Sequence, residues 1–167
     1  DKYHDYPIDQ PSSEFTYCIV SRLVTDKGIG EAITAFRAVH KRHPQTRLLL
    51  IGNGPEQDKF ATQAKGEASI VFAGYQADPL AYIAQSHVFM QPTYHEGFSV
   101  SLVEASMMQK PIIATAVGGN VEIIQNGKTG ILVPAKDSAA LEQAMEQLFT
   151  DGKLRDTLAH HARQQYL

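Results

Sequence analysis

Two glutamates, Glu96 and Glu104, stand eight residues apart in the stretch EGFSVSLVE. If a helix begins near Ser99, its first free N–H groups form a site for an anion. Glu104, in the second turn, then leans back toward that site, because helical side chains point toward the helix N-terminus. Glu96 approaches the same place from the preceding loop. Both carboxylates would repel a phosphate but would accept hydrogen bonds from hydroxyl groups.

This geometry suits an anionic ligand with hydroxyl groups at both ends, which describes a nucleotide sugar. A plainer alternative stays open, in which Glu96 only favours the helix dipole and Glu104 is solvated. Two cations in the stretch SRLVTDKGIGE, Arg22 and Lys27, could hold a phosphate pair at the end of another strand. From spacing alone they could equally be solvated surface charges.

Two glycine-containing stretches follow other predicted strands. Gly74 in FAGYQADP would let the backbone approach a flat group such as a base, while Tyr75 could either stack on that base or cover the core. The stretch LLLIGNGPE lacks the third glycine of a dinucleotide fingerprint, because Gln57 stands there, so a nicotinamide cofactor is not expected. Gly118 and Gly119 predict another close backbone approach.

The elements that must position these residues are short apolar runs that alternate with amphipathic stretches. The runs 16–21, 47–51, 69–73, 87–91, 111–115 and 130–133 are continuously apolar, as in strands covered on both faces. Helices are predicted at 28–43, 55–65, after Asp78-Pro79, at 99–109, near 120–125, at 138–150 and from 153 onward. This alternation predicts βαβ units and a parallel sheet, whose ligands bind at the carboxyl ends of the strands.

The bulk properties exclude several classes of protein. The 167 residues are 43% hydrophobic and carry a net charge of −3. The net charge of the chain therefore gives it no electrostatic attraction to nucleic acid or anionic lipid. The single cysteine, Cys18, is expected to be buried and points to a reducing compartment. No histidine pair has metal-ligand spacing with a third ligand, so no metal site is expected. Residues 1–15 look like a linker, and 16–167 like one domain.

The loops together carry a family resemblance. The order SRLVTDKG, LLIGNGPE, VFAGY, PTYHEGFSVSLVEA, KPIIAT, VGGNVEII and NGKTGILV resembles the carboxyl-terminal, donor-binding half of retaining GT-B glycosyltransferases of family GT4. This implies an α/β fold with a Rossmann-like, doubly wound parallel sheet of about six strands. Two positions depart from the pattern. Gln109 must adopt a helix end where relatives carry glycine, and Ser99 stands where glycine is frequent.

The resemblance implies a role for each singled-out residue. Arg22 and Lys27 would neutralise the donor diphosphate, Glu96 would lie near the transferred sugar's hydroxyls, and Glu104 would hold the ribose hydroxyls. The backbone near Gly74 and Tyr75 would meet the base. The backbone N–H groups of Gly97, Phe98 and Ser99 would contact the sugar. Those of Val100 and Ser101 would contact the phosphate.

The family reaction transfers a sugar from a nucleotide-diphosphate sugar to an acceptor hydroxyl, with retention and without a metal or cofactor. The acceptor, a glycan or a lipid-linked glycan, would bind an amino-terminal domain that is absent here, so this domain alone is expected to be inactive. A cytoplasmic location is expected, with room for peripheral contact at the inner face of the membrane. The alternatives are a GT-B nucleotide-sugar epimerase and a non-catalytic nucleotide- or protein-binding module. Base, sugar and acceptor cannot be read from these residues.

Overall fold

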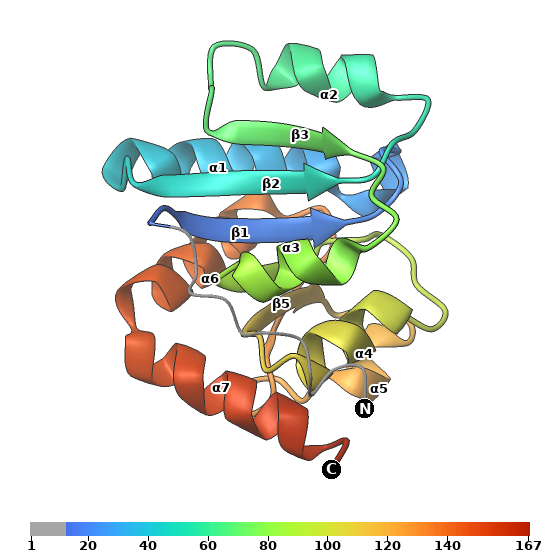
Figure 1. Cartoon of the computed structure of the whole chain (residues 1–167), viewed down its shortest axis with the longest axis vertical. Coiled ribbons are helices and arrows are strands. Elements are labelled where there is room, and N and C mark those ends of the chain that lie inside the picture. The colour runs from blue at the N-terminus through green and yellow to red at the C-terminus, as the bar shows by residue number, and fades with distance from the viewer. Residues whose placement is uncertain (1–12) are drawn as a thin grey trace.

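The computed structural model describes residues 13–167 and contains one parallel sheet (Figure 1). Its strands are β1 (Phe15–Val20), β2 (Thr46–Ile51), β3 (Ile70–Gly74), β4 (Val88–Gln91), β5 (Ile112–Thr115) and β6 (Ile131–Val133). Their spatial order is β3-β2-β1-β4-β5-β6, and each neighbouring pair is parallel. The predicted doubly wound, Rossmann-like sheet is therefore confirmed. Most of the expected linker 1–15 lies outside the described residues, and Phe15 begins β1.

The helices lie close to their predicted limits. They are α1 (Ile29–Arg42), α2 (Gln57–Gln63), α3 (Pro79–Gln85), α4 (Val100–Met107), α5 (Asn120–Ile123), α6 (Ser138–Thr150) and α7 (Gly152–Gln164), with a 3-10 turn, η1, at Thr25–Lys27. Asp78 occupies the N-cap position of α3, and Pro79 is the first helical residue. Proline suits that position because its missing N–H would have no partner there.

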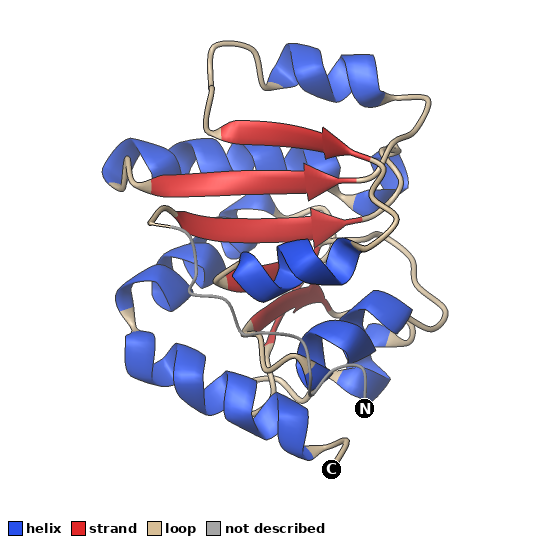
Figure 2. Cartoon of the chain, in the orientation of Figure 1, coloured by secondary structure: helices blue, strands red, loops and turns tan. Residues whose placement is uncertain are grey.

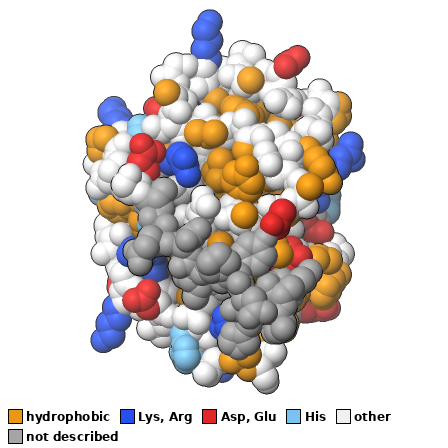
Figure 3. Space-filling model, viewed as in Figure 1, with side chains coloured by type: hydrophobic (Ala, Val, Ile, Leu, Met, Phe, Trp, Pro, Cys, Tyr) orange, Lys and Arg blue, Asp and Glu red, His pale blue; other side chains and the backbone are white. Residues whose placement is uncertain are grey.

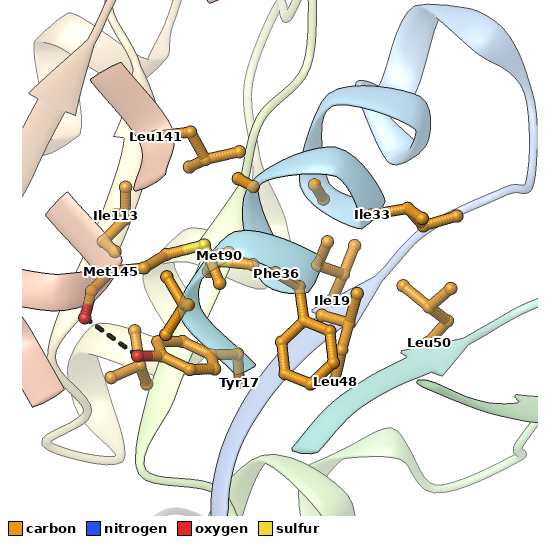
Figure 4. Close-up of a cluster of buried hydrophobic side chains, with 14 of the residues drawn as sticks. Tyr17, Ile19, Ile33, Phe36, Leu48, Leu50, Met90, Ile113, Leu141 and Met145 are labelled. Carbon is orange, nitrogen blue, oxygen red and sulfur yellow. Dashed lines mark hydrogen bonds between the residues drawn. The ribbon is translucent and has the colours of Figure 1, made fainter. Parts of the chain in front are cut away.

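One face of the sheet is covered mainly by α1 and α6, which pack against each other. Figure 4 shows the buried side chains of this side, among them Tyr17 from β1, Phe36 from α1 and Met145 from α6. The Tyr17 hydroxyl donates a hydrogen bond to the carbonyl oxygen of Met145 at 2.8 Å, so the one polar atom of this ring is satisfied inside the core.

The opposite face is covered by α3, α4 and α5, so helices flank the strands on both sides (Figure 2). Cys18 points into this second cluster together with Phe89 and Leu102. Its burial is confirmed, and desolvation raises the pKa of the thiol to about 12. Because neighbouring residues of β1 contact different clusters, both faces of this strand are apolar. That explains the continuous apolar run in its sequence.

The strand order reverses between β1 and β4, and this position organises the site. These two strands are parallel neighbours, so the loops that follow them leave the sheet side by side at its carboxyl edge. The Tyr94 N–H and the Thr93 hydroxyl both donate to the carbonyl oxygen of Asp26, at 2.7 and 3.1 Å. The two loops are thereby tied together at the place where sheets of this kind bind ligands.

Charged side chains are dispersed on the face seen in Figure 3, where Lys and Arg side chains lie apart from one another. Within residues 13–167, none of the helices is long and apolar enough to cross a bilayer. The same part of the chain holds no group of three or more His, Cys, Asp or Glu residues suited to a metal ion.

Candidate donor-binding site

A hollow of about 330 Å³ opens where the loops after β1 and β4 meet the first turn of α4. We call it the α4 hollow. It brings together seven of the residues that the sequence singled out, which are Arg22, Lys27, Glu96, Phe98, Ser99, Val100 and Ser101. These residues come from two loops about 70 positions apart in the chain, and the parallel register of β1 and β4 places them side by side.

The N-terminus of α4 faces this hollow. Ser99 is the N-cap, next to the predicted helix start, and its side-chain oxygen accepts a hydrogen bond from the Leu102 N–H at 3.1 Å. The N–H groups of Val100 and Ser101 have no acceptor within the described part of the chain. Two free donors and the positive end of the helix dipole therefore line the hollow, which makes it suitable for an anion.

Glu96 lies at the wall of the hollow in contact with one of the predicted cations. Its Oε2 atom is 3.6 Å from Lys27 Nζ and accepts a hydrogen bond from Gln91 Nε2 at 2.7 Å. Sequence reasoning directed Lys27 and Glu96 toward different parts of a ligand and did not foresee this ion pair. Both side chains of the pair are partly buried.

The loop that carries Lys27 is held by a carboxylate of the next loop. Glu56 accepts hydrogen bonds from the N–H and the hydroxyl of Thr25, at 2.8 and 2.6 Å. These bonds lower the pKa of Glu56 to about 2.

Arg22 is exposed and lines the α4 hollow and also a second hollow beside it. It is thus placed between the two hollows.

The second hollow, also of about 330 Å³, lies beside Tyr75, and we call it the Tyr75 hollow. Tyr75 is 73% exposed, so of the two predicted alternatives it does not cover the core and is free to stack on a ligand. Gly74 lies just outside this lining with a positive φ of 73°, and a Cβ at this position would meet no atom within 4 Å. Glycine at position 74 therefore allows the positive φ of the turn, and it is not needed there to make room for a neighbouring atom.

The predicted close approach at Gly118 and Gly119 involves the backbone of the Glu96 loop. A Cβ on Gly119 would stand 1.7 Å from the carbonyl oxygen of Gly97. The N–H of Gly119 donates to the carbonyl oxygen of Glu96 at 3.0 Å. The backbone of Gly118 and Gly119, after β5, therefore packs directly against the backbone of the Glu96 loop and supports it. Gly97 itself contacts this support and lies outside the lining of the α4 hollow.

Two further predicted positions lie on α4. Glu104 is half-buried on the second turn, outside the lining of both hollows. Gln109 has a positive φ of 57°, so it adopts the helix end without glycine's freedom, as expected. The N–H groups of Gln109 and Lys110 donate to the carbonyl oxygens of Ser106 and Ala105, both at 3.0 Å. This Schellman pattern ends the helix without disturbing the hollow.

Sequence reasoning missed Gln91, which lines the α4 hollow at the end of β4. Its side chain bonds both Glu96 and Ser99, at 2.7 Å each. A signal was present, because polar Gln91 directly follows the three apolar residues 88–90 at the carboxyl edge of the sheet. Its near neighbour in the sequence, His95, is exposed and lies outside the linings of both hollows.

Comparison with known sequences places the chain in a family. The family model described as glycosyl transferases group 1 matches residues 6–165. The capsular polysaccharide biosynthesis glycosyltransferase CapM of Staphylococcus aureus is 32% identical over 98% of this chain and 43% of the relative. A glycogen synthase of Mycobacterium tuberculosis is 29% identical over 87% of the chain and 36% of the relative. The chain therefore spans less than half the length of these relatives.

Solved structures agree with these matches. The crystal structure of Anabaena Alr3699/HepE in complex with UDP and glucose is 26% identical, with a TM-score of 0.85 over 92% of this chain and 43% of that one. The C-terminal domain of the group 1 glycosyl transferase LpcC from Francisella tularensis is 25% identical, with a TM-score of 0.82 over 98% and 90%. The chain belongs to the group 1 glycosyl transferases and has the fold of the C-terminal domain of a GT-B enzyme.

Proposed function

We propose that this chain is the donor-binding domain of a retaining, GT4-type glycosyltransferase. The enzyme would transfer a sugar from a nucleotide-diphosphate sugar to an acceptor hydroxyl. The observation that carries the proposal is the α4 hollow, where two cations, a free helix N-terminus and a carboxylate meet. The relative Alr3699/HepE, with UDP and glucose in its crystal structure, supports a nucleotide sugar as the ligand.

In this proposal the diphosphate lies against the N-terminus of α4. The N–H groups of Val100 and Ser101 would donate to its oxygens, while Arg22 and Lys27 would balance its charge. As the bond to the sugar breaks, negative charge grows on the leaving diphosphate, and these groups stabilise it. A single well-placed donor of this kind is typically worth about 3 kcal/mol of transition-state stabilisation. The proposed mechanism therefore draws on these groups and needs no metal ion.

The two ends of the donor would be held by hydroxyl and ring contacts. The contacts of Glu96 with Gln91 and Lys27 both fall on its Oε2 atom. Its Oε1 atom would therefore accept hydrogen bonds from the hydroxyl groups of the transferred sugar. Glu104 would hold the ribose hydroxyls from the second turn of α4. The base would enter the Tyr75 hollow and meet Tyr75 and the backbone after Gly74. Because Arg22 lines both hollows, one ligand can extend from one to the other.

The acceptor site belongs, in this proposal, to parts of the protein beyond this chain. The chain covers 43% of the capsular polysaccharide relative, which leaves more than half of such a protein for acceptor binding. The acceptor would be a glycan or a lipid-linked glycan. We therefore expect the isolated chain to bind a donor weakly and to transfer nothing.

Calorimetry with UDP, GDP and ADP tests the proposal on the chain alone. We expect saturable binding of at least one of them, and its loss in Arg22→Ala. A folded sample that binds none of the three at millimolar ligand would rule out the site. In the full-length protein, a donor screen separates the alternatives. Transfer that requires an acceptor indicates a transferase, product from donor alone indicates an epimerase, and binding without turnover indicates a non-catalytic module.

A further inference from the structure

Gln91 makes two short contacts that join separate parts of the α4 hollow. It is the last residue of β4, after three buried apolar residues. Its Nε2 atom donates to Glu96 Oε2 at 2.7 Å, and its Oε1 atom accepts from the Ser99 hydroxyl at 2.7 Å. One amide thus bridges the loop carboxylate and the N-cap of α4.

The chemistry of the two neighbours fixes which way the amide of Gln91 points. An ionised Glu96 carboxylate can only accept, so it must face the NH₂ group of Gln91. The Ser99 hydroxyl already accepts a hydrogen bond from the Leu102 N–H, and its proton is free to point at Gln91 Oε1. A flipped amide would place two acceptors against each other at Glu96. The bridge therefore has one consistent arrangement.

The bridge leaves half of the Glu96 carboxylate available. Both close contacts, from Gln91 and from Lys27, fall on Oε2, and within residues 13–167 no group donates to Oε1. Ser99, at the other end, is 4% exposed and is held by its own cap bond. One oxygen of the carboxylate is thus tied through Gln91 to the start of α4, while the other is left without a donor within residues 13–167.

We propose that Gln91 is a positioning residue, which fixes the Glu96 carboxylate for the donor's sugar and couples it to the helix N-terminus that receives the diphosphate. This inference rests on the proposed donor-binding function. Gln91 acts through Glu96 and Ser99. Its removal should leave the nucleotide contacts in place while it loosens the sugar contact. A hydrogen bond to a charged group typically accounts for about tenfold or more in binding.

The first test needs no ligand. We would record the side-chain carboxyl ¹³C resonance of Glu96 in the unmodified chain and in two variants. Gln91→Met keeps the length of the side chain without its hydrogen bonds, and Gln91→Glu keeps the acceptor for Ser99 but sets a second carboxyl group against Glu96 Oε2. Both variants should shift the Glu96 resonance and leave that of Glu104 unchanged. The matched control is Gln63→Met, because Gln63 donates to the Gly30 carbonyl at 2.8 Å, away from the hollow. An unmoved Glu96 resonance in both variants would overturn the proposal.

The second test uses calorimetry with UDP and with UDP-glucose as probes. In Gln91→Met we expect UDP affinity within twofold of the unmodified chain and UDP-glucose affinity about tenfold lower. Equal weakening of both ligands, or of neither, would contradict a positioning role. If the unmodified chain binds no nucleotide at all, the proposed function fails, and the Glu96 resonance still decides whether Gln91 positions the carboxylate.

Discussion

Gly119→Ala should displace the loop that carries Glu96 by a defined amount. A Cβ at position 119 would lie 1.7 Å from the Gly97 carbonyl oxygen, whereas real Cβ atoms essentially never approach within 3.0 Å. The Glu96 loop and the segment around Gly119 must therefore separate by at least about 1.3 Å, the difference between these two distances. Gly119 has an ordinary φ of −65°, so the substitution introduces a clash without backbone strain.

The magnitude follows from this displacement. Overpacking of a well-packed region typically costs about 1–3 kcal/mol, and retreat of the loop also lengthens the 3.0 Å hydrogen bond from the Gly119 N–H to the Glu96 carbonyl oxygen. We therefore expect the free energy of unfolding to fall by about 2 kcal/mol. The shift would also weaken the hydrogen bonds that Glu96 is proposed to accept from the sugar. A hydrogen bond to a charged group typically contributes about 1.5–3 kcal/mol, so donor-sugar affinity should fall by roughly tenfold or more.

Urea unfolding measures the first effect, and calorimetry with a nucleotide sugar measures the second. Gly30→Ala is the matched control, because its Cβ would meet only the side chains of Gln63 and Phe60, at ordinary distances of 3.5 Å or more. That variant should be as stable as the unmodified chain or about 1 kcal/mol more stable, since alanine favours helix. Suppose that the free energy of unfolding of Gly119→Ala lies within about 0.5 kcal/mol of that of the unmodified chain, and that both bind the nucleotide sugar equally well. The proposed support of the Glu96 loop by Gly119 is then refuted.

Three further predictions concern stability. Gln109→Gly should raise the free energy of unfolding by about 0.5–1 kcal/mol, because it relieves a φ of 57°; a lower urea midpoint would contradict this. Lys110→Met should lower it by about 1–3 kcal/mol, because buried Lys110 Nζ donates to the carbonyl oxygens of Ala84 and Ser86 at 2.6 and 2.9 Å; an unchanged urea midpoint would argue against it. Burial lowers the pKa of His87 to about 4 from its ordinary value of 6.5, and its Nδ1 accepts a hydrogen bond from the Thr16 N–H. Between pH 6.5 and 4, His87 therefore binds fewer protons in the folded chain than in the unfolded chain. Urea midpoints should therefore fall as pH drops from 6.5 toward 4, and less steeply in His87→Gln; equal slopes would contradict this.

The sequence predicts the elements of this fold well because the apolar pattern and the capping residues act locally. The centre of the run TYCIVS is apolar without alternation, and the structure places the neighbours Tyr17 and Cys18 in opposite core clusters. The helix predicted to start near Ser99 begins at Val100, with Ser99 as its N-cap. The location of the α4 hollow follows as well, since parallel strands place their following loops at one edge.

The internal contacts of the site could not be predicted in the same way. The Lys27–Glu96 pair and the Gln91 bridge join residues of different loops, and their geometry depends on how those loops pack. Gly118 and Gly119 indicated a close approach, but the sequence could not name the Glu96 loop as the partner. A side-chain pairing between loops depends on the tertiary structure, which local patterns do not contain.

The most direct test of the central claim is a map of the backbone N–H groups that respond to a nucleoside diphosphate. We would titrate the ¹⁵N-labelled chain with UDP and follow its amide resonances by NMR. The largest saturable shifts should fall on Val100 and Ser101 at the start of α4, with smaller ones around Lys27. Saturable binding that leaves Val100 and Ser101 unmoved, with shifts confined to another surface such as the hollow beside His161, would contradict the account.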